Sequence, residues 1–168
     1  VFQGAYVYNI DVENGFAYTQ ELIAKWKDDP LIQIAVCPHA PYTCSPEILE
    51  RCAWIAETNG VFLHTHLSET LREIEDIKTH TGFRPVQWLD SLGILGPKTI
   101  AAHCVWLDEK DLDILATRDV LVVHCPESNM KLASGISPVP SMLQRGIRVA
   151  LGTDGSASNN DLDLFGEM

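Results

Sequence analysis

The repeated alternation of short apolar runs with amphipathic stretches constrains the fold more than any other feature of this chain. Residues 31–43, LIQIAVCPHAPYT, form one apolar run, and the SPEILERCAWIAETNG that follows carries apolar residues at helical spacing. Ser45 suits the N-cap of this helix, Pro46 its first position and Gly60 its end. This part of the sequence therefore predicts a strand followed by a helix.

The same pattern returns along the rest of the chain. The runs GVFLHTH, TIAAHCVWL, DVLVVHCPES and GIRVALGTDG predict four more strands. Helices are expected before residue 30, over about 70–79, after an N-cap at Asp108, near 140–145 and beginning just before the end of the chain. Apolar strands that each lead into a helix indicate a parallel sheet buried on both faces, either doubly wound or part of a (β/α)8 barrel.

Polar residues that could bind a metal or act as an acid or base follow every predicted strand. Both candidate architectures gather ligand chemistry at the carboxyl ends of their strands. Those ends carry, in chain order, His39, His66 with Glu69, His103, His124 and Asp154. Any single histidine here is more simply explained as an ordinary strand-end residue, but five such ends on one rim favour a shared site.

Within FLHTHLSET, strand alternation sends His64 and His66 to the same side, with His66 nearer the rim. His66 is therefore the better candidate metal ligand, and Glu69 is placed to reach a metal-bound water. Asp154 lies in a glycine-containing loop that lacks both phosphate-binding spacings, which favours a functional role for its carboxylate over phosphate binding by the loop. His64 and His124 receive no chemical role.

The composition disfavours several classes of partner. The net charge of −11, from 12 Lys+Arg against 23 Asp+Glu, disfavours binding to nucleic acid or to an anionic membrane surface. No apolar run approaches the roughly 20 residues that span a bilayer. The 5 cysteines contain no C-x-x-C pair and are expected to be reduced, small core residues of a cytoplasmic protein. The cytidine-deaminase signature of H-x-E with P-C-x-x-C is also absent.

The motifs HTHLSET, AAHCVWL, HCPESNMKLASG and GTDGSASNNDLDLFGEM resemble those ending the last four barrel strands of the amidohydrolase superfamily. The sequence is most similar to its 5-methylthioadenosine/S-adenosylhomocysteine deaminases, in the group that also holds triazine hydrolases and guanine deaminase. The resemblance runs from about residue 31 onward. It implies an α/β fold that is a partial (β/α)8 TIM barrel of about strands 4 to 8. Residues 1–168 would then be the C-terminal part of the catalytic barrel, with the strand 1 region and the flanking β-domain absent.

The resemblance also implies a set of site residues. The family binds one divalent metal, usually zinc with iron as the alternative, and His66 and Asp154 match two of its ligands. Glu69 matches the residue that protonates the purine ring, His103 orients the water, and Asp154 also accepts its proton. His39 matches a substrate contact, alongside Glu69 and Asp154.

The activity implied for the parent enzyme is hydrolytic deamination of 5-methylthioadenosine or S-adenosylhomocysteine, with release of ammonia. The alternatives are a triazine chlorohydrolase, a guanine-type aminohydrolase or, in another class, a non-catalytic barrel remnant that acts as a binding module. The partner is expected to be a small molecule, a purine nucleoside or related heterocycle. Whether the protein forms a homo-oligomer is left open. Since the family's H-x-H of strand 1 has no counterpart, the isolated chain is expected to be inactive.

Overall fold

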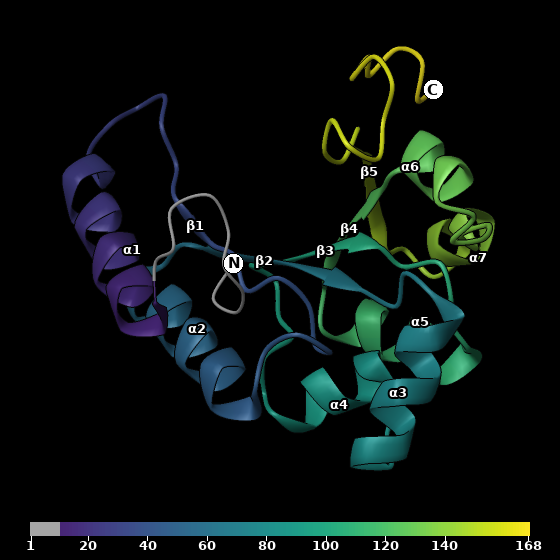
Figure 1. Cartoon of the computed structure of the whole chain (residues 1–168), viewed down its shortest axis with the longest axis horizontal. Coiled ribbons are helices and arrows are strands. Elements are labelled where there is room, and N and C mark those ends of the chain that lie inside the picture. Colours follow the sequence, from purple (N-terminus) through teal and green to yellow (C-terminus); the bar gives the residue numbers. More distant parts are fainter. Residues whose placement is uncertain (1–10) are drawn as a thin grey trace.

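A computed structural model describes residues 11–168 as one parallel sheet flanked by helices (Figure 1). The strands pair in sequence order, β1-β2-β3-β4-β5, and every neighbouring pair is parallel. The elements are α1 Val12–Trp26, β1 Ala35–Val36, α2 Pro46–Asn59, β2 Phe62–Leu67, α3 Leu71–Thr81, α4 Pro85–Ser91, β3 Thr99–His103, α5 Glu109–Thr117, β4 Leu121–His124, α6 Pro126–Lys131, α7 Val139–Gln144 and β5 Arg148–Leu151. This consecutive parallel order confirms the predicted α/β fold class, a partial barrel.

Side-chain caps set the helix boundaries that the sequence predicted. The Ser45 hydroxyl accepts from the Ile48 N–H at the start of α2, which Gly60 ends in the left-handed conformation with φ 65°. In α5, Asp108 and Asp111 each accept the other's backbone N–H, which completes a capping box. The predicted strand-to-helix transitions therefore rest on local hydrogen bonds as well as on apolar periodicity.

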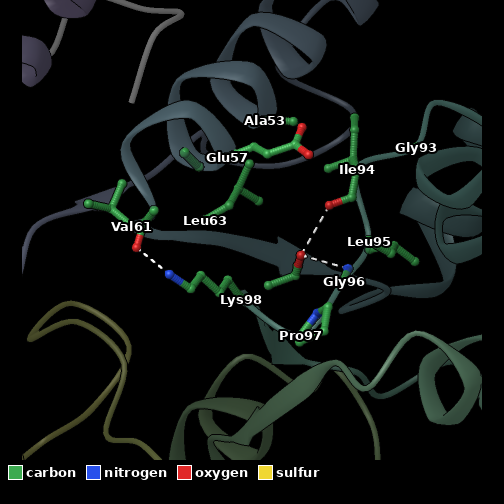
Figure 2. A pocket seen from close by; sticks show the side chains of 13 residues that line it. Ala53, Glu57, Val61, Leu63, Gly93, Ile94, Leu95, Gly96, Pro97 and Lys98 are labelled. Carbon is green, nitrogen blue, oxygen red and sulfur yellow. Dashed lines mark hydrogen bonds between the residues drawn. The ribbon is translucent and has the colours of Figure 1, made fainter.

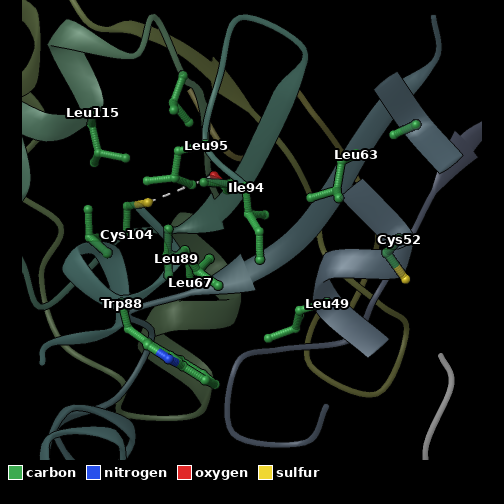
Figure 3. Packing of buried hydrophobic residues seen from close by; sticks show 14 of the residues in the cluster. Leu49, Cys52, Leu63, Leu67, Trp88, Leu89, Ile94, Leu95, Cys104 and Leu115 are labelled. Carbon is green, nitrogen blue, oxygen red and sulfur yellow. Dashed lines mark hydrogen bonds between the residues drawn. The ribbon is translucent and has the colours of Figure 1, made fainter. Parts of the chain in front are cut away.

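The hydrophobic core lies between the sheet and the helices that cover one of its faces (Figure 3). Leu63 and Leu67 of β2 point into this core, where they join buried residues of α2 and α4. Because side chains alternate along a strand, His64 and His66 lie on the opposite face of β2. Burial of the leucines thus fixes the side of the sheet on which the histidines lie.

The expectation that all five strands are buried on both faces is wrong for β5, which is largely exposed, with Leu151 at 38%. β1 has only 2 residues, of which Val36 is buried. β5 has one neighbouring strand within the described residues, so its other edge is unpaired there.

Three helix predictions also need correction. The sequence reading missed α4 and α6, which have 7 and 6 residues and are too short to show a clear helical period. No helix begins near the end of the chain, where residues 164–167 form a turn. There the Asn159 side chain accepts from the backbone of Asp161 and Leu162, a local bond that competes with helix formation.

The five cysteines, all within the described residues, form no disulfide, as expected, but Cys37 is exposed and is not a core residue. It directly follows the short strand β1, where the chain leaves the sheet. Over residues 11–168, none of the helices combines the length and the apolar character needed to cross a membrane.

Candidate metal centre

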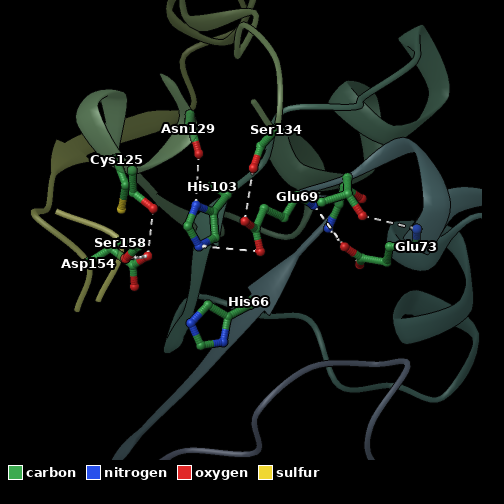
Figure 4. Close-up of polar contacts among 12 residues, drawn as sticks. His66, Glu69, Glu73, His103, Cys125, Asn129, Ser134, Asp154 and Ser158 are labelled. Carbon is green, nitrogen blue, oxygen red and sulfur yellow. Dashed lines mark hydrogen bonds and ion pairs between the residues drawn. The ribbon is translucent and has the colours of Figure 1, made fainter. Parts of the chain in front are cut away.

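His66, His103 and Asp154 converge beyond the carboxyl ends of the strands (Figure 4). One ligand atom from each lies within 4.8 Å of the others, a grouping able to hold a metal ion. Parallel register places Leu67 beside His103, and the His66 and His103 rings stack with centroids 5.4 Å apart. Residues far apart in sequence are thus gathered at one rim, as the sequence predicted.

The ring of His66 is fixed by the backbone of His39. Its Nδ1 lies 2.7 Å from the His39 carbonyl oxygen, and its own backbone N–H donates to the same oxygen at 3.0 Å. A carbonyl only accepts, so Nδ1 carries the proton and Nε2 keeps its lone pair. Metal-bound histidines commonly use this arrangement, in which a backbone acceptor sets the tautomer.

Two hydroxyl groups hold the carboxylate of Asp154. Ser128 and Ser158 donate to its Oδ2 at 2.7 and 2.5 Å, and no side chain among the described residues occupies Oδ1. Partial burial raises the pKa of Asp154, but the two hydroxyl bonds and nearby His103 outweigh it, so the pKa is lowered overall. The carboxylate is therefore ionised at neutral pH, as a cation ligand must be.

The turns after these strands adopt a backbone conformation that side chains rarely take. Ser68, His103, Cys104 and Asp154 have φ values of 52°, 72°, 48° and 59°. Left-handed conformations of residues other than glycine cost on the order of 1–3 kcal/mol each and cluster at functional sites. Here they coincide with the ends of β2, β3 and β5, which carry the converging side chains.

Glu69 lies beside the three converging groups without joining them. Its Oε1 accepts from the Ser134 hydroxyl at 3.0 Å, and its Oε2 is 3.8 Å from Nε2 of His103. Its side chain is 15% exposed, which leaves it reachable from the rim. This position suits a group that moves protons next to a metal rather than one that binds it.

The sequence reading missed Glu73, which holds the backbone of the turn carrying Glu69. It is 3% exposed, and its two oxygens accept from the N–H groups of Ser68 and Glu69, each at 2.8 Å. Burial raises the pKa of Glu73 to about 7 despite those two hydrogen bonds. The spacing of Thr70 and Glu73 is that of a capping box, a signal that could have identified it.

The remaining rim histidines lie around the centre. The His39 ring is 4.9 Å from that of His66, and its Nδ1 lies 2.8 Å from the Thr43 hydroxyl. His64 stacks at 6.4 Å from His66 on the same face, as strand alternation predicted. Burial lowers the pKa of His39, His64 and His124, which favours their neutral forms.

A cavity of about 520 Å³ lies at the opposite ends of β2 and β3 (Figure 2). Its walls include Ala53, Leu63 and Ile94, and Lys98 at its edge bonds to the Gly60 carbonyl. None of the converging histidines or carboxylates lines it. We therefore do not assign the candidate active site to this cavity, despite its volume.

Comparison with known proteins agrees with this geometry. The chain is 61% identical over 157 residues to a 5-methylthioadenosine/S-adenosylhomocysteine deaminase of Syntrophobacter fumaroxidans, covering 94% of this chain and 36% of that protein. It is 55% identical over 140 residues to a 5'-deoxyadenosine deaminase of Methanothermobacter thermautotrophicus, and the match covers 83% of this chain and 33% of that protein. A crystal structure of an adenosine deaminase from Xanthomonas campestris with bound zinc superposes with a TM-score of 0.95 at 41% identity. The superposition covers 99% of this chain and 38% of that one.

The chain thus spans about a third of the length of the curated relatives that it matches. The sequence profile of the amidohydrolase family matches residues 3–168. This match agrees with the resemblance carried by the strand-end motifs, and the chain belongs to the amidohydrolase family.

Proposed function

We propose that the whole protein is a metal-dependent deaminase that hydrolyses an adenosine derivative, 5-methylthioadenosine or S-adenosylhomocysteine, and releases ammonia. The observation that carries this proposal is the convergence of His66, His103 and Asp154, with Glu69 beside them. The relatives named as deaminases of 5'-modified adenosines support the substrate class.

The donor set fits zinc, with iron as the alternative. His66, through Nε2, and Asp154, through its open Oδ1, would hold the ion, since imidazole nitrogen and carboxylate oxygen are usual zinc ligands. A divalent ion bound there would make water nucleophilic at neutral pH by lowering its pKa toward about 7. Further ligands would come from an H-x-H pair outside residues 1–168.

The residues of this chain divide the proton transfers between them. Asp154 accepts the proton of the attacking water, and Nε2 of His103 orients that water. Glu69 delivers a proton to the purine ring nitrogen, which makes the neighbouring ring carbon electrophilic. The carbon–oxygen bond then forms, and Glu69, now ionised, carries the proton of the new hydroxyl group to the amine. The carbon–nitrogen bond breaks as the carbonyl forms, the amine leaves as ammonia, and the water proton held by Asp154 returns to Glu69. His39 contacts the substrate, together with Glu69 and Asp154.

The test is ammonia release by the full-length protein from 5-methylthioadenosine, S-adenosylhomocysteine, 5'-deoxyadenosine and guanine, with chloride release from a chlorotriazine in parallel. The proposal predicts turnover of the adenosine derivatives, its loss with a chelator and its return with zinc. Turnover of guanine or the chlorotriazine alone would instead establish one of the alternative hydrolases. Failure to find bound metal by elemental analysis would favour the non-catalytic binding module.

The same proposal places this chain within a larger protein. Residues 1–168 would form the C-terminal part of the catalytic barrel, about strands 4 to 8, and a cytoplasmic location suits five cysteines outside disulfides. A small purine nucleoside would be the partner, and size-exclusion chromatography with light scattering would show whether the protein is a homo-oligomer. The isolated 168-residue chain is predicted to be inactive, which the same ammonia assay checks.

A further inference from the structure

A single segment, residues 128–134, contacts three different candidate catalytic groups. The Ser128 hydroxyl donates to Asp154, and the Ser134 hydroxyl donates to Glu69 at 3.0 Å. Between these two serines, Oδ1 of Asn129 lies 2.9 Å from Nδ1 of His103 (Figure 4). Three side chains of one short stretch thus each reach a different group of the proposed reaction.

The three side chains have no other hydrogen-bonded role in the part of the chain that the structure describes. Ser128, Asn129 and Ser134 are 0%, 2% and 4% exposed, and each makes one side-chain hydrogen bond. Burying a polar group costs free energy unless a partner compensates for it. The one side-chain partner of each residue is a candidate catalytic side chain, so these groups are placed for the site and not for the core.

The backbone of the segment is held firmly enough to position them. The Trp106 indole N–H donates to the Ser134 carbonyl at 2.7 Å, and the Ser134 N–H donates to the Asn129 carbonyl at 2.9 Å. A Cβ on Gly135 would lie 2.9 Å from a Val105 methyl, which shows how closely the chain approaches the turn after β3. Displacing the segment would therefore also move the turn that follows His103.

We infer that residues 128–134 form a positioning element that orients His103, Glu69 and Asp154 together. Asn129 accepts the proton of His103 Nδ1, which leaves the Nε2 lone pair facing the reaction centre. Ser134 occupies Oε1 of Glu69 and leaves Oε2 to carry the proton. Ser128 occupies Oδ2 of Asp154 and leaves Oδ1 for the cation. This inference rests on the proposed function and adds Ser128, Asn129 and Ser134 to it as positioning residues.

The histidine rings of the full-length protein test the first of these roles directly. Long-range ¹H–¹⁵N spectra, with His103 assigned through His103→Gln, should show its proton on Nδ1. Asn129→Asp keeps an acceptor oxygen and should retain that signal, whereas Asn129→Ala should lose it. A proton on Nε2 in the unsubstituted protein would overturn the assignment. So would the reverse pattern in the variants, in which Asn129→Asp loses the Nδ1 signal and Asn129→Ala keeps it.

The two serines should separate in their effects on metal affinity and turnover. Ser128→Ala should weaken zinc binding in a chelator competition by about 10-fold or more, as supporting residues of metal sites do. Ser134→Ala should leave zinc affinity unchanged but lower kcat by about 10-fold at constant KM. The two variants thus report separately on Asp154 and on Glu69.

Thr99→Val is the matched control, because it also removes a buried hydroxyl, but from the start of β3 at the opposite end of the sheet. It should lower the melting temperature without changing zinc affinity, kcat or the His103 spectrum. Behaviour of Ser128→Ala and Ser134→Ala identical to this control would overturn the inference. If the unsubstituted protein deaminates none of the compounds, the proposed function fails, and the zinc affinities and histidine spectra still decide the inference.

Discussion

The two ends of the sheet differ in what their buried polar groups do. At the amino end, the Thr99 hydroxyl accepts from the Gly96 N–H and donates to the Ile94 carbonyl, so it is fully paired beside an apolar cavity. At the carboxyl end, Ser68 Oγ, His124 Nδ1 and Asn129 Nδ2 are buried without a partner in the described chain. An unpaired buried polar atom costs about 1–3 kcal/mol, and left-handed turns add to that cost.

The difference agrees with a sheet whose amino end contributes to stability and whose carboxyl end carries the proposed site. In barrels of parallel strands the carboxyl end carries the active site, and the opposite end contributes to stability. Substitutions at the two ends should therefore affect different measurements.

Replacing Asp154 with alanine should have the largest effect. The variant loses both a proposed cation ligand and the acceptor of the water proton, so kcat/KM should fall on the order of 10⁴-fold. Bound zinc, measured by elemental analysis, should fall with it. Retention of stoichiometric zinc and near-normal turnover would remove Asp154 from the site.

Glu69→Gln should come next. It keeps the size of the side chain but removes the transferable proton, so kcat should fall by about 10²- to 10⁴-fold. Zinc content should remain that of the unsubstituted protein, because Glu69 lies outside the group of converging ligands. A loss of metal in this variant would instead place Glu69 among the ligands.

The pH dependence of stability should reveal Glu73. Its pKa rises from 4.5 to about 7 in the folded protein, so folding takes up a proton between these values. The resulting stability, on the order of 3 kcal/mol, is present below pH about 4.5 and is lost as the pH rises through about 7. Urea unfolding across this range should show the loss, and Glu73→Gln should flatten it. An equally steep loss in the variant would assign the effect to another group.

Thr99→Val should have the smallest effect and should act only on stability. Removing its hydroxyl leaves the Gly96 N–H and Ile94 carbonyl without their partner, at a cost of about 1–3 kcal/mol. Denaturant unfolding should register this change while kcat and KM stay constant. A change in kcat would show that the two ends are coupled.

The sequence predicted the central strands and the convergence of their ends because both follow from local patterns. Strand alternation placed His64 and His66, and the apolar runs located the rim that His103 and Asp154 share. The burial of β5 was mispredicted because it depends on which neighbours the strand has, and apolar periodicity does not report this. The short helices α4 and α6 leave too few turns for a period.

The supporting residues were harder to foresee. Asn129 and Ser134 are small polar residues in a segment without strand or clear helical periodicity, and their role appears only when β3 and the turn after β2 are brought beside them. Glu73 resembles an ordinary acidic residue of a first helical turn until its burial is known. These hydrogen bonds join residues that are 26 and 65 positions apart in the sequence. They form only in the folded chain, so the spacing of residues within one segment does not predict them.

The most direct test of the central claim is the position of the metal in crystals of the full-length protein grown with zinc. Anomalous scattering at the zinc edge should place one ion within about 2.0–2.2 Å of Nε2 of His66 and a carboxylate oxygen of Asp154. Glu69 should lie beside the ion without ligating it. Zinc bound elsewhere, or absent from the carboxyl ends of β2 and β5 at full occupancy of other sites, would contradict the account.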